Sequence, residues 1–225
     1  FLAASLSFIY DIADLCEHCG ADVVKVSQAL KSDPRVGKEA YLDASIGFSG
    51  GTLGRDLQIL LDKAADKDLD VPVLKGTFLK NKNRWRMVES ILKEEVKAWK
   101  KSKIGILGAT YKPGTSTLRH SLSLEVIRAL SPKVRSVYVH DPMAEKEEIE
   151  KTASCVFYRE VEEMVKGCNV LVLMTACPEY QELDFIKIGK AMRPPRLFLD
   201  TKNFLWNHEE KIRRAGLLYR GIGRG

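Results

Sequence analysis

The sequence lacks long apolar runs, has few aromatic residues and shows no export signal. No segment reaches the ~18–20 consecutive apolar residues of a membrane-spanning helix, and the first residues carry neither a basic segment nor a cleavage-site pattern. We therefore expect a cytoplasmic protein with no membrane partner. Hydrophobic residues make up 45% of the 225 residues, which excludes a disordered tail. Because Phe1 lies within a helical pattern and is not preceded by an initiator Met, we also expect a piece of a longer chain.

Cysteine is scarce and irregularly spaced. The five cysteines are an odd number in a chain long enough to fold without disulfides, so reduced thiols are expected. Cys16 and Cys19 form a C-x-x-C motif, but no second pair completes a zinc site. The helical pattern around them favours packing in the core over metal or redox work. No metal site is predicted.

Acidic residues are few between Lys75 and Lys103, a stretch that contains ten basic residues and three acidic ones. The chain as a whole carries +6, so this stretch alone accounts for its positive charge. A basic stretch with Trp85 and Trp99 is compatible with a nucleic-acid surface. Apolar residues at helical spacing instead favour one helix, from about Thr77 to Ala98, with a solvated basic face. We prefer the second interpretation because no nucleic-acid-binding module is recognisable.

The two halves of the chain have different hydrophobic periods. The first half is helical in pattern, with two adjacent apolar stripes before Gly20 that suit a helix packed on several sides or at a subunit interface. Gly20 is a helix stop and Asp22 an N-cap. After Ser102, short β segments alternate with helices, which predicts a parallel sheet. The predicted strands are 103–107, 135–140, 155–158, 170–175, 196–199 and 217–220. We therefore expect an α/β fold class, with a helical domain (1–98) followed by a Rossmann-like domain (99–225).

The first predicted strand leads into a loop, Gly108 to Ser121, that lacks the G-x-G-x-x-G pattern of dinucleotide-binding proteins. Lys112, Arg119 and several hydroxyl groups lie in this loop ahead of a helix start, which suits a phosphate. Ligands bind at the carboxyl ends of strands in such sheets. A generic polar loop explains the same residues equally well.

Several segments together resemble the UDP-glucose/GDP-mannose dehydrogenase family of nucleotide-sugar dehydrogenases, in the family's order and over nearly the whole chain. Gly47-Phe-Ser-Gly-Gly-Thr-Leu-Gly-Arg-Asp56 is the strongest match. The others are Leu15–Val23, Asp33–Gly37, Lys103–Gly108, Tyr111-Lys112, Leu118–Ser121, His140–Pro142 and Tyr219–Gly223.

The resemblance implies an oxidoreductase that moves hydride from the primary alcohol of a UDP- or GDP-sugar to NAD, towards the uronic acid. Family members have an NAD-binding Rossmann domain, a central helical domain that forms the dimer, and a C-terminal domain for the nucleotide diphosphate. This chain resembles the second and third. We therefore expect a homodimer that binds a nucleotide diphosphate sugar, with NAD held mainly by the absent domain and no activity of this piece alone. The family's catalytic Lys and Asn fall before Phe1.

The resemblance also assigns roles to individual residues. The catalytic positions are Thr52, in the place of the family's thiolate-forming cysteine, and Asp56, a water-orienting or base carboxylate. The substrate-binding positions are Arg35 (towards the neighbouring subunit's substrate), Tyr41, Gly47, Phe48, Gly50, Gly51, Lys112 and Lys202. Arg119 matches an arginine that reaches the NAD pyrophosphate, and Lys202 replaces a frequent arginine.

Threonine at position 52 changes the expected chemistry. A thiol with a pKa of about 8.5 forms some thiolate near neutral pH, whereas a hydroxyl needs a dedicated base. An alternative hypothesis is therefore a divergent member that stops at the aldehyde, or a non-catalytic, scaffolding subunit. A nucleic-acid-binding module is the less favoured third hypothesis.

Overall fold

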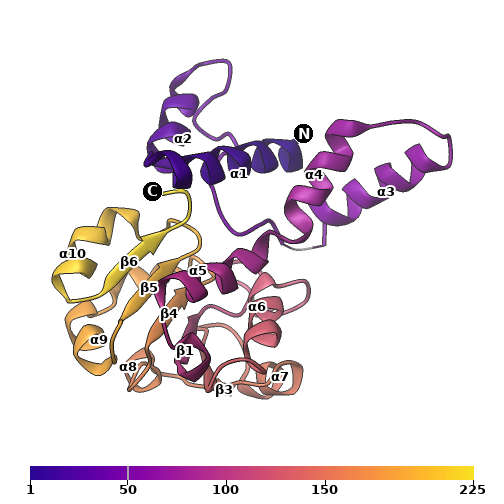
Figure 1. The fold of residues 1–225 in the computed structure, drawn as a ribbon. Coiled ribbons are helices and arrows are strands. Elements are labelled where there is room, and N and C mark those ends of the chain that lie inside the picture. The colour runs from indigo at the N-terminus through magenta and orange to yellow at the C-terminus, as the bar shows by residue number, and fades with distance from the viewer. Residues whose placement is uncertain (50) are drawn as a thin grey trace. The chain divides into compact units, whose positions relative to one another are not determined.

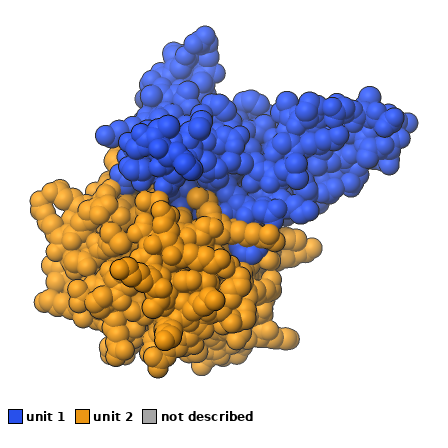
Figure 2. Space-filling model, in the orientation of Figure 1, with its two compact units in different colours: residues 1–85, 222–225 blue, residues 86–221 orange. Residues whose placement is uncertain are grey.

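The computed structural model describes residues 1–49 and 51–225, drawn in Figure 1. These residues form two compact units, shown in Figure 2. The first unit contains residues 1–85 and 222–225, and the second contains residues 86–221. Within the described ranges, no helix is both long and apolar enough to cross a membrane.

The first unit is helical, with local signals that match its helix boundaries. Its helices are α1 (Leu2–Cys19), α2 (Val23–Ser32), α3 (Leu53–Ala65) and α4 (Pro72–Lys82). Gly20 ends α1 in the left-handed conformation with φ of 67°, and the Asp22 carboxylate caps α2 by accepting from the Val24 N–H at 2.8 Å. The predicted stop and cap are both confirmed.

The two apolar stripes of α1 have different environments. Ile9, Ala13 and Cys16 are buried in the core of the first unit. Phe8 and Leu15, from the neighbouring stripe, are 49% and 61% exposed. Cys19 is also exposed, so the prediction that it packs in the core is wrong, because it lies on the exposed side at the end of α1.

The second unit is a six-stranded parallel sheet with the order β3-β2-β1-β4-β5-β6. Its strands are β1 (Lys103–Leu107), β2 (Ser136–His140), β3 (Val156–Phe157), β4 (Val170–Leu173), β5 (Leu197–Asp200) and β6 (Leu218–Gly221). The predicted α/β class is confirmed, and each predicted strand is present within two residues of its expected bounds. This strand order is that of a Rossmann fold.

Helices alternate with these strands. They are α5 (Met87–Glu95), α6 (Leu122–Leu130), α7 (Lys146–Thr152), α8 (Val161–Met164), α9 (Phe185–Ala191) and α10 (Glu209–Arg214), with short 3-10 turns at Arg84–Arg86, Trp99–Lys101, Pro178–Glu182 and Trp206–His208. Every residue of β4 and β5 is buried. Because successive strand residues point to opposite faces, both sheet faces are covered there. One core cluster joins α8, α9 and α10 to β4, β5 and β6.

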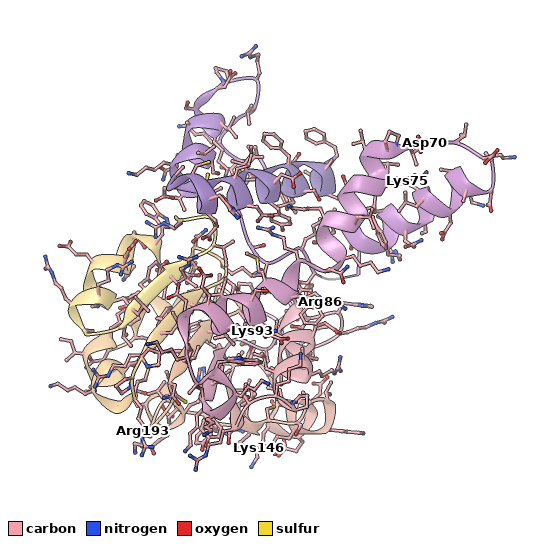
Figure 3. All side chains as sticks on the ribbon, viewed as in Figure 1. Asp70, Lys75, Arg86, Lys93, Lys146 and Arg193 are labelled. Atoms are coloured by element: carbon pink, nitrogen blue, oxygen red, sulfur yellow. The ribbon has the colours of Figure 1, made fainter. Side chains whose placement is uncertain are left out.

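The predicted continuous basic helix from Thr77 to Ala98 is wrong. The chain leaves the helix after Lys82, makes a 3-10 turn over Arg84–Arg86 and begins α5 at Met87. Helix α4 begins at Pro72, where a proline suits the first helical turn. Several basic residues are paired with acids: Lys75 lies 2.7 Å from Asp70, labelled together in Figure 3, and Lys93 lies 2.9 Å from Glu89.

The last residues of the chain complete the first unit. The Gly223 carbonyl accepts from the Val23 N–H at 2.9 Å, and the Gly223 N–H donates to the Glu17 carboxylate at 2.7 Å. Arg224 pairs with Asp22 at 3.1 Å. A Cβ at Gly223 would lie 2.7 Å from that of Ala13, so only glycine fits this corner.

Candidate functional site

Thr52 and Asp56 lie at the start of α3, one helical turn apart. The Asp56 N–H donates to the Thr52 carbonyl at 2.9 Å, and Thr52 makes no side-chain cap hydrogen bond. Both side chains are exposed. The Asp56 carboxylate accepts from the guanidinium of its neighbour Arg55 at 3.1 Å. The first unit thus presents a hydroxyl and a cation-paired carboxylate together at an accessible helix N-terminus.

The segment before Thr52 is held by side chains of α4 and the following turn. Asn81 donates to the Phe48 carbonyl at 3.2 Å and accepts from the Phe48 N–H at 2.8 Å, so one side-chain amide holds both backbone groups. The Arg84 guanidinium donates to the Ser45 carbonyl at 2.7 Å. Neither Asn81 nor Arg84 is identified by sequence reasoning, because their partners are more than 30 residues away.

Arg84 is buried and is the centre of a cluster of polar side chains in the first unit. Its guanidinium binds the Asp14 carboxylate at 2.7 Å and lies over the Tyr10 ring, 4.7 Å from the ring centroid. Lys80 pairs with the other Asp14 oxygen at 2.6 Å. Burial raises the pKa of Tyr10 to about 12, so its hydroxyl stays protonated beside Ser45 at 3.1 Å.

The other predicted residues of the first unit lie along the same segment. Arg35 is 88% exposed and holds the Asp33 carboxylate with two hydrogen bonds of 3.0 and 2.6 Å, which lowers the pKa of Asp33. Tyr41 and Gly51 are exposed, whereas Gly47 is buried with φ of 125°. Gly50 lies outside the described residues.

Four strands of the second unit end in register at one sheet edge. Leu107 pairs with His140 and with Leu173, and Leu173 pairs with Asp200. The segments that follow β1, β2, β4 and β5 therefore leave from the same edge, which is where ligands bind in such sheets. The loop with Lys112 and Arg119 follows β1, and Lys202 follows β5.

The β1 loop is fixed at its start and exposed at its tip. Gly108 has φ of 92° and lies so close to Thr175 that a Cβ would be 2.3 Å from the Thr175 Cβ. Ser121 caps α6 and also donates to the Ala109 carbonyl at 2.6 Å. Lys112 and Arg119 are both exposed. Two cations that point into solvent from an anchored loop can bind an anion with little further ordering.

Lys202 has a different electrostatic environment. It follows the fully buried Asp200, whose carboxylate accepts from the backbone N–H groups of Lys202 and Leu205 and from the Tyr219 hydroxyl. Burial raises the pKa of Asp200 despite these hydrogen bonds. Burial of the ammonium group lowers the pKa of Lys202 to about 8. An anion next to this ammonium group would favour its protonated form.

Within the described part of the chain, no group of three or more His, Cys, Asp or Glu side chains could hold a metal ion.

The predicted site residues that the structure describes fall into two sets. The first unit contains Arg35, Tyr41, Gly47, Phe48, Gly51, Thr52 and Asp56, and the second contains Lys112, Arg119 and Lys202 at one sheet edge.

Comparison with known proteins identifies similar sequences over both units. The model of the UDP-glucose/GDP-mannose dehydrogenase family, central domain, matches residues 1–83, and that of the same family's UDP binding domain matches residues 105–207. A UDP-glucose 6-dehydrogenase of Rhizobium meliloti (strain 1021) is 32% identical over 227 residues, which cover 100% of this chain and 51% of that protein. UDP-glucose 6-dehydrogenase TuaD of Bacillus subtilis (strain 168) is 31% identical over 226 residues, which cover 100% of this chain and 48% of that protein.

A solved structure of a UDP-glucose dehydrogenase from Pyrobaculum islandicum matches the fold. Its TM-score is 0.85 at 25% sequence identity, with 100% of this chain and 49% of that chain covered. The chain spans about half the length of the curated relatives that it matches.

Proposed function

Because the chain belongs to the UDP-glucose/GDP-mannose dehydrogenase family, we propose that it supplies the nucleotide-sugar site of an NAD-dependent dehydrogenase that oxidises the primary alcohol of a UDP- or GDP-sugar. The match to the family's UDP binding domain, at residues 105–207, is the observation that carries this proposal. The relatives are about twice as long, and we propose that this chain alone does not turn over.

In this proposal the second unit binds the nucleotide diphosphate at the edge where β1 and β5 end. Lys112 on the β1 loop and Lys202 after β5 provide cationic contacts to the substrate's diphosphate. Their strands end in register with β4 between them, which places both segments at one edge. Arg119 extends from the same loop towards the NAD pyrophosphate.

Residues of the first unit are proposed to contact the sugar of the nucleotide sugar. The segment Tyr41–Phe48 is proposed to lie along the sugar, and Arg35 to reach a neighbouring subunit's substrate. Asp56 orients a water or accepts a proton near the reacting carbon. NAD, when bound, accepts the hydride.

Thr52 favours a second candidate, an enzyme that stops at the aldehyde. Its side chain is an exposed hydroxyl without a cap hydrogen bond. A hydroxyl without a strong base does not form the covalent intermediate that a cysteine thiolate forms. The number of NADH molecules formed per sugar by a full-length enzyme separates the two candidates: one fits an aldehyde product and two fits a uronic acid.

We also propose a homodimer formed through the first unit. Phe8 and Leu15, which belong to one apolar stripe of α1, are 49% and 61% exposed in the single chain. Burial of such a stripe between two copies removes apolar surface from water. In such a dimer, the role that the family resemblance assigns to Arg35 is to reach the site of the other copy.

Titration calorimetry with UDP tests the proposed nucleotide site. We expect saturable binding by this chain, weaker binding after Lys112→Met, and unchanged binding after Lys190→Met, an exposed lysine at the end of α9, ahead of the start of β5 and so at the opposite edge of the sheet. The Lys112 change removes a cationic contact to the diphosphate and is expected to weaken binding about tenfold. Absence of heat with UDP, UDP-glucose and GDP-mannose at millimolar concentration would contradict the proposal.

The lowered pKa of Lys202 gives nucleotide binding a pH dependence. In the free chain the ammonium group loses its proton near pH 8, and a bound diphosphate would raise its pKa. Binding therefore takes up a proton above pH 8, and affinity should fall by up to about tenfold per pH unit until the pKa of the complex is reached. Titrations from pH 7 to 9.5 check this expectation.

Lys202→Arg is the matched variant for this experiment. An arginine stays charged over the whole range, so its complex should lose the pH dependence, while any titration of the nucleotide itself persists in both proteins. Equal pH profiles for the two proteins would show that Lys202 does not contact the diphosphate.

A further inference from the structure

In the first turn after β1, the N–H and carbonyl groups of Ala109 and Thr110 all have hydrogen-bond partners within the second unit. The N–H groups of Ala109 and Thr110 both donate to one carboxylate oxygen of Asp141, at 2.7 and 2.9 Å. The Ala109 carbonyl accepts from the Ser121 hydroxyl at 2.6 Å, and the Thr110 carbonyl accepts from the Thr175 hydroxyl at 2.7 Å. In dinucleotide-binding Rossmann domains the N–H groups of this turn face the pyrophosphate.

Asp141 is bound on both of its oxygens. The oxygen that does not face the β1 turn accepts from the N–H groups of Met143 and Ala144, at 2.8 and 3.0 Å. The residue is 3% exposed and follows the last residue of β2, which pairs in register with the last residue of β1. Hydrogen-bond donors that surround a buried carboxylate in this way offset the free-energy cost of removing its charge from water.

A neutral amide cannot replace this carboxylate. Asparagine at position 141 would direct its NH2 group at two backbone N–H donors in either orientation of the side chain, and donors facing donors leave buried groups unsatisfied. The site therefore requires an anion with two accepting oxygens.

We propose that Asp141 is an internal anion that takes the position of a ligand phosphate at the β1 turn. As a positioning residue it fixes the base of the loop that carries Lys112 and Arg119, and it prevents a dinucleotide from using the turn. The diphosphate is then bound further out on the loop, by the exposed cations. The last step rests on the proposed nucleotide-sugar function; the occupation of the turn does not.

Hydrogen exchange with the small carboxylate formate as a probe tests the inference. In Asp141→Ala, the Ala109 and Thr110 amides should exchange roughly 10- to 100-fold faster than in the wild type, because each loses a hydrogen bond to a charged group. Formate, compared with chloride at equal ionic strength, should restore their protection by entering the vacated position. UDP affinity should fall about tenfold and recover with formate.

Two variants make the result specific. Asp141→Asn should lose the same protection without recovery in formate, because its side chain still fills the position. Asp184→Ala removes an exposed carboxylate that caps α9 by accepting from the Lys187 N–H. In this variant the Ala109 and Thr110 amides should exchange as in the wild type, with or without formate. If Asp141→Ala folds only in formate, the inference is supported. If it folds in neither salt, or its amides stay protected, or formate has the same effect on Asp184→Ala, the inference is overturned.

Failure of the proposed function has a different signature. A wild-type chain that does not bind UDP contradicts the nucleotide site, whereas amide protection and its recovery in formate involve no nucleotide and report on Asp141 alone.

Discussion

Replacing Gly108 by alanine is expected to destabilise the second unit by about 4 kcal/mol or more. The new Cβ would lie 2.3 Å from the Thr175 Cβ and 2.7 Å from the Thr175 backbone nitrogen, so no side-chain rotation relieves the contact. The backbone φ of 92° adds strain for any residue other than glycine. Denaturant unfolding followed by circular dichroism measures the loss, and UDP titration should show weakened binding because the base of the β1 loop must move.

Gly114→Ala is the matched control in the same loop. Gly114 also has positive φ, at 71°, but a Cβ there would meet no atom within 4 Å. Only the conformational strain applies, which is about 1–2 kcal/mol for a residue with a Cβ. If both variants lose the same stability, the contact with Thr175 is not the cause and the expectation for Gly108 fails.

Arg84→Met is expected to destabilise the first unit by about 2–4 kcal/mol. The Arg84 side chain is 4% exposed and contacts the Asp14 carboxylate and the Ser45 carbonyl. Methionine fills much of the volume but supplies no donor, so the Ser45 carbonyl loses its partner and Asp14 keeps only Lys80. Urea unfolding and hydrogen exchange across α1 and α4 measure the effect.

Arg35→Met is the matched control, because it removes an exposed arginine of the same unit whereas Arg84→Met removes a buried one. Arg35 also binds a carboxylate with two hydrogen bonds, but its side chain is 88% exposed. Its removal should leave the unfolding midpoint nearly unchanged, because water replaces the lost partner. Equal destabilisation by the two variants would mean that burial of Arg84 does not determine its contribution.

The sequence predicts those parts of the fold that depend on neighbouring residues. Alternation of short β segments with helices identifies the strands of the second unit, and the central strands β4 and β5, which are buried on both faces, appear as apolar runs. Gly20 and Asp22 are recognised as helix stop and cap because these roles depend on conformations and hydrogen bonds within a few residues.

The missed features depend on contacts that are distant in the sequence. The apolar spacing continues past Lys82, yet the chain turns there, and Arg84 reaches Asp14, 70 positions earlier. The same is true of Asn81 with Phe48 and of Asp141 with Thr110. Periodicity records only which side of an element is apolar, and it contains no information about such partners. The roles of Thr52 and Asp56 come from resemblance and stay predictions.

The contacts of residues 222–225 have a consequence for the order of folding during synthesis. Domains generally form in the order in which the ribosome delivers them, the N-terminal one first. Here the second unit is one continuous stretch, 86–221, and is ready to fold as soon as it has emerged. The first unit cannot complete its hydrogen bonding until Gly223 has emerged, because the Gly223 carbonyl accepts from the Val23 N–H and the Gly223 N–H donates to the Glu17 carboxylate. The first unit, although most of it precedes the second in the sequence, is therefore the last of the two to reach its final hydrogen bonding.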